Sequence, residues 1–445
     1  KPSNESTNIA TLNELPEHLL LHNLSFLSSL DAFQTSSLSH KWRDLWHSIP
    51  SLDFDYTDFP LFDSPHETRQ LFADFVDQTL LLRSNYRLLE FNLRFEYAEP
   101  QYYSLINSWI RYAINHRVLK LCLNFNIGLD YYPETNYDDI DNDCFYDFHL
   151  SVLRNSCVRV FELCYCDLVL PTHMPATHFV SLQSLCFFEV GLSDENVSNL
   201  ISGCLNLESL VIKFCNGMKN LRICSSKLKE LSLCFLYPEG DEESSLEICA
   251  ASLRSISIIC FPMAKYSLKD LSSLVEAHVY FHHRNEHYVK YWSRVVRSFS
   301  GVKRLNVQNW WFKFLVTKDV SSERFVLNKL EHLELQTRYT KYHLLGIAAL
   351  LEVSPNINTM VLGYHHKMDE DEILPEEFLN RPINFSLPSL RQVKIKNFKG
   401  MKDEIDFLML LKKQGVILEK IVLVPAKKGE TSLVLIRPFE MIEFL

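Results

Sequence analysis

Apolar residues follow one short pattern along most of the chain. They recur at positions i, i+3 and i+5 of successive segments, and the last two are separated by a polar residue, which is typical of a strand with one buried face. The pattern recurs thirteen times, mostly at intervals of 21 to 28 residues. The first apolar positions are Leu88, Val118, Val158, Leu182, Leu207, Leu228, Leu253, Leu274, Val302, Leu330, Ile357, Leu390 and Leu418.

This interval and spacing predict a leucine-rich-repeat solenoid, in which each unit contributes one strand to a parallel sheet. At about 4.8 Å per strand the sheet would be curved and about 60 Å along its arc, with helices or irregular segments outside. The helical stripe between 102 and 116 is interpreted as solenoid core. The ninth repeat position favours Asn or Cys and is occupied by Asn126, Cys166 and Cys215.

The segment from Leu15 to Trp46 has a different, helical spacing. Pro16 stands at a first helical position, and Leu20, Leu24 and Leu27 follow on one face. Asp31 is expected to cap a second helix in which Leu38, Trp42 and Leu45 line one side. Some 40 residues cannot bury so many large apolar side chains alone. Part of this surface should therefore meet another chain or the following domain.

Composition narrows the function classes. Hydrophobic residues make up 47% and charged residues 22%, which are ordinary globular values. The net charge of −10 opposes phosphate attraction, so nucleic acid is not an expected partner. No apolar run approaches the roughly 20 residues that span a bilayer, so no membrane association is expected either. The polar residues 1–10 lack a secretory apolar segment, and the twelve cysteines are interpreted as free thiols. These features favour an intracellular protein, in the nucleus, the cytoplasm or both.

Three stretches carry a specific resemblance to plant F-box modules: Leu15 to Leu27, Ser36 to Trp46 and Pro50 to Asp55. The segment Trp109 to Val118 resembles the opening of the repeats in that family. The C-terminal part is similar to the FBD module that follows such repeats, through Leu387, Pro388, Leu390, Val393, Ile395, Phe398, Gly400, Glu404, Leu410, Leu411 and the run Leu418 to Leu423. The resemblance covers nearly the whole chain.

The resemblance implies an α/β repeat protein: a flexible tail at 1–11, a helical F-box at 12–55, a leucine-rich-repeat solenoid at 80–380 and FBD-like repeats at 381–425. It further implies docking of a Skp-family adaptor, and through it a cullin-RING ubiquitin ligase, while the repeats select an unknown target protein. The chain itself would be non-catalytic and need no cofactor. The residues implied in adaptor binding are Leu15, Pro16, Leu19, Leu20, Leu24, Leu27, Leu38, Trp42 and Leu45.

Two positions depart from the family pattern. Asn23 stands where Ile or Val is common, and Gln34 stands where relatives often carry Arg. Burying Asn23 unpaired against an adaptor would cost about 1–3 kcal/mol. The alternative function is therefore a repeat-based binding scaffold whose F-box docks weakly or not at all.

Motifs for enzymatic or metal chemistry are missing from the sequence. With eleven glycines there is no phosphate loop of the GxxxxGK type and no GxSxG turn. The stretch 139–150 starts like a calcium loop but has Cys144 at its sixth position and Leu150 at its twelfth, and is rejected. The histidine clusters at 282–287 and 365–366 and the pair Cys164 and Cys166 do not have zinc-site spacing, so no metal site is expected.

Three acidic insertions follow directly on predicted strands, at 128–147, 239–243 and 364–377. All three should leave the same edge of the solenoid, where they either attract a basic target segment or are simply solvated loops. The candidate target-binding residues are Tyr131, Asp139, Asp141, Asp369 and Asp371.

The FBD-like segment is locally basic. Lys394, Lys396 and Lys399 flank the inward-facing Val393 and Ile395, an alternation that a strand with one solvent-facing side requires. A phosphate or inositol-phosphate co-ligand on these lysines is the alternative interpretation.

Overall fold

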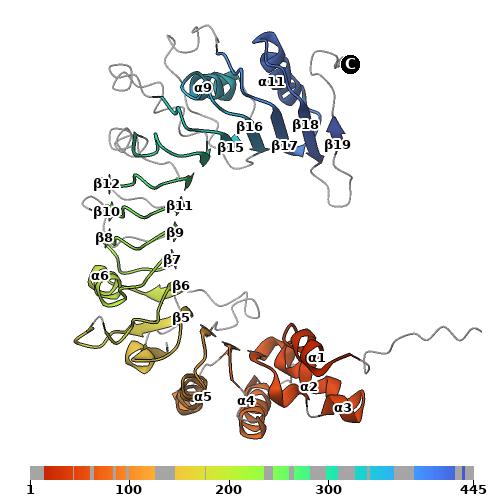
Figure 1. Cartoon of the computed structure of the whole chain (residues 1–445), viewed down its shortest axis with the longest axis vertical. Coiled ribbons are helices and arrows are strands. Elements are labelled where there is room, and N and C mark those ends of the chain that lie inside the picture. Colours follow the sequence, from red (N-terminus) through yellow and green to blue (C-terminus); the bar gives the residue numbers. More distant parts are fainter. Residues whose placement is uncertain are drawn as a thin grey trace, which may run out of the picture. The chain divides into compact units, whose positions relative to one another are not determined.

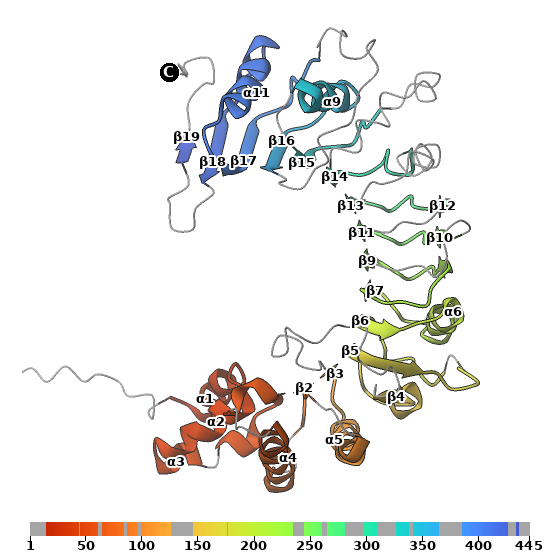
Figure 2. The ribbon, with the colours of Figure 1, turned by 180° about the vertical axis from the view of Figure 1, so that it is seen from behind.

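The structure is a computed structural model, shown as a ribbon in Figures 1 and 2. It describes residues 15–43, 45–60, 65–83, 87–96, 100–125, 146–175, 177–234, 244–259, 265–280, 297–308, 326–337, 341–364, 385–425 and 433–435. The chain divides into two compact units, one of residues 1–192 and 199–207 and the other of residues 193–198 and 208–445. Each unit is described by itself.

The first unit begins with short helices and continues into a parallel sheet. Its helices are α1 (Glu17–Leu24), α2 (Ser29–Gln34), η2 (Thr35–Ser37), α3 (His40–Arg43), η3 (Leu45–Ser48), η4 (Tyr56–Asp58), α4 (Pro65–Leu82), η5 (Pro100–Tyr102), α5 (Tyr103–Asn115) and η8 (Leu150–Leu153). Its strands are β1 (Ser51–Asp55), β2 (Glu90–Arg94), β3 (Lys120–Asn124), β4 (Asp147–His149), β5 (Val160–Val169) and β6 (Ser184–Gly191). They are ordered β1-β2-β3-β5-β6, and β4 pairs with the outer part of β5.

The core of this sheet is rich in aromatic side chains. Phe54, Phe72, Phe91 and Phe95 are almost fully buried; Phe54 meets Phe91 edge to face at 5.8 Å, and Phe72 stacks on Phe95 at 5.0 Å. Trp109 of α5 is also buried, and its indole nitrogen donates a hydrogen bond of 2.6 Å to Asp77 Oδ1 on α4. This bond satisfies the one polar group of the indole, so the two helices can pack closely behind the strands.

The second unit carries the remaining repeats. Its main strands are β7 (Ser209–Lys213), β9 (Glu230–Cys234), β11 (Ser255–Ile259), β13 (Glu276–Tyr280), β14 (Arg304–Gln308), β15 (His332–Thr337), β16 (Thr359–Tyr364), β17 (Gln392–Phe398) and β18 (Lys420–Pro425), which pair in parallel in that order. A last short strand, β19 (Leu433–Leu435), pairs antiparallel with β18. The helices are α9 (Lys341–Glu352) and α11 (Lys402–Lys413), while α6 (Asp194–Gly203) has residues in both units.

A second, smaller sheet lies opposite β7, β9, β11 and β13 (Figures 1 and 2). It contains β8 (Asn220–Cys224), β10 (Ser245–Cys249) and β12 (Lys265–Lys269), again parallel and in register. In these repeats a strand replaces the outer helix that α9 and α11 provide in later ones. The interval between repeats is shortest here, with as few as 21 residues from Leu207 to Leu228, which leaves room for a strand but little for a helix.

The predicted repeat register is confirmed. All thirteen first positions, from Leu88 to Leu418, are at most 4% exposed. Each stands two residues before one of the thirteen strands β2, β3, β5, β6, β7, β9, β11 and β13 to β18. The alternating burial of each strand explains the i+3 and i+5 positions, which point into the core. Position nine also behaves as expected in Cys215, which is buried and donates its thiol proton to the Lys213 carbonyl at 3.3 Å.

Three local predictions near the N-terminus are wrong in detail. Ser28, not Asp31, caps α2, because its hydroxyl accepts a hydrogen bond from the Asp31 amide at 3.3 Å. The expected second helix is broken at Leu38, so that Trp42 lies on α3 and Leu45 on η3. The predicted helical F-box at 12–55 ends in a strand, because Ser51–Asp55 is the first strand of the repeat sheet and pairs with β2.

Candidate functional site

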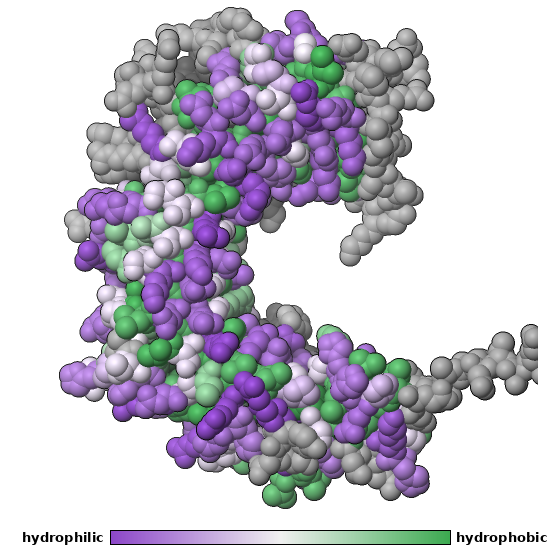
Figure 3. Space-filling view, viewed as in Figure 1, coloured by the Kyte–Doolittle hydropathy of each residue, from purple (hydrophilic) through white to green (hydrophobic). Residues whose placement is uncertain are grey.

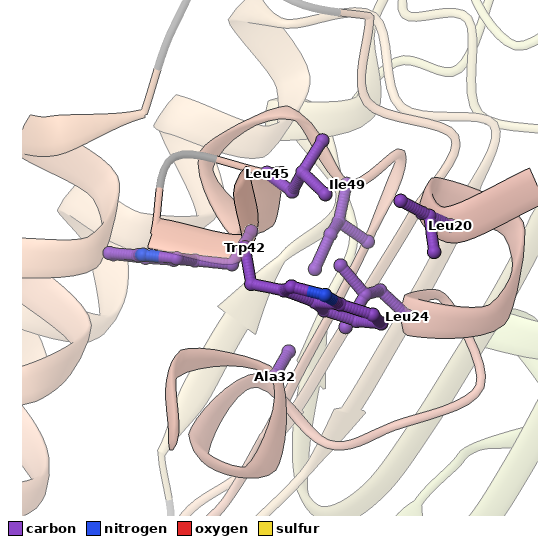
Figure 4. Packing of buried hydrophobic residues seen from close by; sticks show 7 residues of the cluster. Leu20, Leu24, Ala32, Trp42, Leu45 and Ile49 are labelled. Carbon is purple, nitrogen blue, oxygen red and sulfur yellow. The ribbon is translucent and has the colours of Figure 1, made fainter. Parts of the chain in front are cut away.

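The N-terminal helices enclose a small core of their own. It contains Leu20, Leu24, Ala32, Trp42, Leu45, Trp46 and Ile49, each at most 7% exposed, with Leu15 and Leu21 packed against it. Figure 4 shows side chains of this core brought together from successive helices, with Leu20, Leu24, Ala32, Trp42, Leu45 and Ile49 labelled. Leu20 and Leu24 lie one helical turn apart and so point the same way from α1. We call residues 15–50 the helical module.

Polar contacts fix the ends of the helices in the module. The Lys41 ammonium on α3 donates a hydrogen bond of 2.8 Å to the Leu15 carbonyl, just before α1. The Ser29 hydroxyl at the start of α2 accepts from the Asp53 amide of β1 at 2.9 Å. The second of these hydrogen bonds joins the module to the first strand of the sheet.

The residues predicted to bind an adaptor fall into two groups. Leu20, Leu24, Trp42 and Leu45 are buried inside the module. For these four the expectation of direct contact needs correction, because a side chain inside its own core has no surface to offer a partner. Leu19, Leu27 and Leu38 are 41%, 39% and 65% exposed, Pro16 is exposed and Leu15 is half-buried. For these five residues adaptor contact stays a prediction.

Two exposed aromatic residues were missed. Phe26 is 74% exposed, and Phe33 is 42% exposed although its ring touches Trp46 and Phe75 at centroid distances of 5.3 and 5.8 Å. Five of the large exposed apolar side chains thus fall within the helical module, and apolar atoms show at its surface in Figure 3. We call Leu19, Phe26, Leu27, Phe33 and Leu38 the apolar surface of the module. The sequence did carry a signal for them, because the segment holds more large apolar side chains than some 40 residues can bury.

Asn23 lies on the outer side of α1. It is exposed in this chain, and it stands one turn after Leu19, so the two residues share a helix face. The isolated chain therefore does not bury the Asn23 amide. Any cost of desolvating that amide would arise only when a partner covers α1.

A second candidate site is a polar network on the solvent-facing side of β13 to β17. The Glu276 carboxylate accepts hydrogen bonds from Arg304 at 2.8 Å and from His278 Nε2 at 3.0 Å. These bonds, the Arg304 bond above all, hold the pKa of Glu276 below its ordinary value, so the carboxylate stays charged. At the end of β13, Tyr280 donates its hydroxyl proton to Asn306 of β14. Burial raises the pKa of Tyr280 to about 12, which keeps it a hydrogen-bond donor at neutral pH.

The network extends two strands further along the sheet. The Lys396 ammonium on β17 reaches Glu334 on β15 at 2.5 Å, passing over β16. Gly363 of β16, opposite both Lys396 and Gln336 in the strand register, leaves room for the Gln336 side chain, which a Cβ at position 363 would meet. Lys396, one of the lysines considered for a phosphate, is thus engaged by a carboxylate of this chain. The Glu334 carboxylate beside Lys396 would repel a phosphate, so the arrangement favours a network of paired polar side chains over an anion site.

The predicted target-binding residues Tyr131, Asp139, Asp141, Asp369 and Asp371 lie outside the described residues, as do the acidic insertions except for their ends. The histidine clusters also lie outside them. Within the ranges that the structure describes, no three His, Cys, Asp or Glu side chains come together as a metal site. Over the same ranges, no helix is both long and apolar enough to cross a bilayer.

The fold and the module define a class: a leucine-rich-repeat protein with a helical F-box-type module at its N-terminal end. The chain belongs to the family described as the At1g61320/AtMIF1 leucine-rich-repeat domain, whose model matches residues 82–434. The confirmed repeat register falls within this range from Leu88 to Leu418.

Homologues cover the helical module as well. The F-box/LRR-repeat protein 13 of Arabidopsis thaliana is 26% identical over 97% of this chain and 93% of its own length. The F-box/FBD/LRR-repeat protein At1g78750 of the same plant is 26% identical over 94% of this chain and 90% of its own length. The putative F-box/LRR-repeat protein At5g02930 is 27% identical, covering 80% of this chain and 72% of that protein. The predicted kinship with plant F-box/LRR/FBD proteins is confirmed, and no enzyme family appears among these relatives.

Proposed function

We propose that this chain is the substrate-recognition subunit of an SCF-type ubiquitin ligase and docks a Skp-family adaptor through the apolar surface of its helical module. The observation that carries the proposal is the contrast between buried and exposed apolar side chains within residues 15–50. Leu20, Leu24 and Trp42 already close the module's core, yet Leu19, Phe26 and Leu38 remain outside it. Exposed apolar surface of this kind marks an interaction site. The names of the relatives support the identification of the module as an F-box.

Such a receptor needs no catalytic residue of its own. By binding both an adaptor and a target, it raises the effective concentration of the target's lysines near the ubiquitin-transfer machinery. The thiol and acid groups of the described core fit a non-catalytic role. Burial raises the pKa of Cys204 to about 12, which leaves that thiol protonated and unreactive.

The test is binding of the purified full chain to a purified plant Skp-family adaptor, with a double variant that removes only exposed leucines. We expect Leu27→Ala/Leu38→Ala to weaken the complex at least tenfold, about 1.4 kcal/mol of binding free energy. Leu81→Ala/Leu82→Ala is the matched control, because these leucines of α4 are 84% and 57% exposed but lie outside the module. This control should bind like the unmodified chain.

Two results would overturn the proposal. One is failure of the unmodified chain to bind any Skp-family adaptor of its source, which would leave the scaffold function. The other is equal loss of affinity in both double variants, which would mean that the apolar surface of the module has no special role. Thermal unfolding of each double variant is the control that tests whether the substitutions act through stability; we expect unchanged melting temperatures.

For target selection we propose the polar network of β13 to β17 as a contact surface. Its side chains come from the four strands β13, β14, β15 and β17, and their mutual hydrogen bonds hold them in place before a target arrives. Proteins captured by the chain with the proteasome blocked should be lost from a Glu276→Gln/Lys396→Gln variant while the adaptor is retained. Capture of the same target at unchanged yield would exclude this surface.

The acidic insertions are a second proposal for the target contact, on the strength of their charge. Reversing Asp139, Asp141, Asp369 and Asp371 to Lys should release a target that binds through a basic segment. The adaptor should stay bound, because the changes lie outside the module. Unchanged target binding would dismiss the insertions.

A further inference from the structure

The outer sheet of β8, β10 and β12 presents two cysteines side by side. In β8 and β10 the alternate residues Leu221, Ile223, Leu246 and Ile248 are buried. The remaining residues therefore point outward, and these include the last residue of each strand, Cys224 and Cys249. Cys224 is directly opposite Cys249 in the strand register. Cys224 is exposed and Cys249 is half-buried.

The two thiols have different surroundings. The Cys249 thiol donates a hydrogen bond of 3.2 Å to Asp270 Oδ2, which raises the pKa of Cys249 and keeps it protonated. The Arg222 guanidinium lies near Cys224 and forms an ion pair with Glu247 at 3.2 Å, and the Cys224 and Cys249 thiols are near enough to influence each other. One thiol of the pair is thus held protonated by a carboxylate, while the other lies beside a cation and faces solvent.

We propose that Cys224 and Cys249 form an oxidisable dithiol, which a hydroperoxide converts to a disulfide that links two successive repeats. Register-paired residues of neighbouring strands lie about 4.8 Å apart. Their Cα atoms thus fall within the range of about 4.4–6.8 Å that a disulfide spans. The backbone does not need to rearrange, because the Ser225 amide already donates to the Cys249 carbonyl at 3.0 Å and holds the strand ends together.

The exposure of Cys224 and the hydrogen bond of Cys249 to Asp270 assign the order of events. Cys224, which faces solvent, attacks one peroxide oxygen as the thiolate: an S–O bond forms, the O–O bond breaks, and the second oxygen leaves as hydroxide that takes up the proton lost by the Cys224 thiol and becomes water. Cys249 then attacks the sulfur of the Cys224 sulfenic acid. The S–S bond forms, the S–O bond breaks, and the departing hydroxide leaves as water with the proton of the Cys249 thiol. Two thiols and one hydrogen peroxide thus give one disulfide and two waters.

A second pair of cysteines in the chain is a natural control. Cys122 on β3 and Cys164 on β5 also lie on neighbouring strands, but Cys122 is opposite Glu162 and Cys164 is opposite Asn124. The offset of two residues places their side chains about 7–8 Å apart, beyond disulfide reach. Burial and the Glu162 charge also raise the pKa of Cys122, so little of it is thiolate. Proximity in register, and not merely a shared sheet face, is therefore what distinguishes Cys224 and Cys249.

The experiment treats the fully reduced full-length chain with limiting hydrogen peroxide, blocks the remaining thiols with an alkylating reagent, and maps disulfides by mass spectrometry. We expect a linked Cys224–Cys249 peptide, reversed by dithiothreitol, at least tenfold more abundant than any Cys122–Cys164 product. In Cys249→Ser, Cys224 should instead be trapped as sulfenic acid by dimedone. Cys122→Ser should leave the yield of the Cys224–Cys249 link unchanged.

Replacement of the neighbouring cation separates the assigned chemistry from simple proximity. Arg222→Ala should slow formation of the linked peptide severalfold, because it removes the positive charge beside the attacking sulfur. The proposal is overturned if both cysteines stay alkylatable while others oxidise, or if Cys224 links only to another molecule on a non-reducing gel. An Arg222→Ala chain that oxidises at the original rate would contradict the assignment of Cys224 as the attacking thiol.

Discussion

The helical module and the repeats handle their apolar residues differently. In the repeats each strand and its connecting segment cover the neighbouring unit, so all thirteen first repeat positions are at most 4% exposed. The module has a closed core of seven buried residues but keeps Leu19, Phe26, Leu27, Phe33 and Leu38 at its surface. A repeat is completed by the next repeat, whereas within the described residues these five side chains of the module stay at the surface. The adaptor proposed above would cover them.

The strongest test of the repeat side of this comparison is Trp109→Ala. Trp109 is 1% exposed and hydrogen-bonded to Asp77. Its truncation should lower the free energy of unfolding by about 3–5 kcal/mol, because a large cavity opens between α5 and the strands. Chemical denaturation measures the loss. Trp109→Phe, which keeps most of the volume, should cost clearly less; an equal cost would assign the effect to the lost hydrogen bond.

The module should respond in opposite ways at its inner and outer leucines. Leu24→Ala removes a core side chain that is 1% exposed and should cost about 2–5 kcal/mol of stability. Leu38→Ala removes one that is 65% exposed and should change stability by no more than about 0.5 kcal/mol. Thermal and chemical unfolding of both variants give the comparison. Similar losses in the two would mean that the outer surface is packed in solution.

The N-terminal caps of α11 in the repeats and α1 in the module differ as well, with a smaller expected effect. The Glu404 carboxylate is fully buried and accepts hydrogen bonds from the amides of Met401 at 2.8 Å and Lys399 at 3.1 Å, so it closes the first turn of α11. α1 begins after Pro16 with no such side-chain cap. Glu404→Ala removes the charged acceptor of these two amides and should cost about 1–3 kcal/mol by denaturation. Glu404→Gln, which keeps an acceptor oxygen, should cost less, and an unchanged Glu404→Ala chain would refute the capping role.

The smallest effect is a pH dependence at β1, where the module joins the sheet. Burial, and then the charges of Asp55 and Asp58, raise the pKa of Asp53 above its ordinary 3.8. A carboxyl whose folded pKa is raised stabilises the fold below 3.8, and that contribution is lost as pH rises through the folded pKa. Asp53→Asn should therefore be more stable than the unmodified chain at pH 7, and the advantage should shrink toward pH 4.

Unfolding free energies at several pH values between 4 and 7 test this dependence. Asp74→Asn, a change at an exposed residue of α4, is the control and should leave the profile as it was. A parallel pH profile for Asp53→Asn and the unmodified chain would show that Asp53 is not the responsible group.

The repeat register could be predicted because it depends on spacing alone. An apolar residue at i, i+3 and i+5 must turn inward wherever a strand begins at i+2, and Leu88, Leu228 and Leu390 all do so. The outer strands β8, β10 and β12 could not be predicted in the same way. Their segments are five residues long with the same alternation, and only the short repeats around them exclude a helix.

The candidate site was predicted in outline but not residue by residue. Leu20 and Leu38 carry the same side chain and both fit the family pattern, yet one is 0% and the other 65% exposed. Helical spacing shows that leucines share a face; it does not show which face the module's own core takes. The break of the second helix at Leu38 made that choice, because it turned Trp42 and Leu45 inward and left Leu38 outside.

By itself the sequence determined the class of fold, the register of every repeat and the presence of an F-box-type module. These features depend on local periodicity and on motifs of residues that are close together along the chain. Only the tertiary structure decided which leucines of the module face outward, that Ser51–Asp55 starts the sheet, and that Cys224 meets Cys249. Those three facts depend on contacts between segments distant along the chain. Such contacts are fixed by packing, which no single segment encodes.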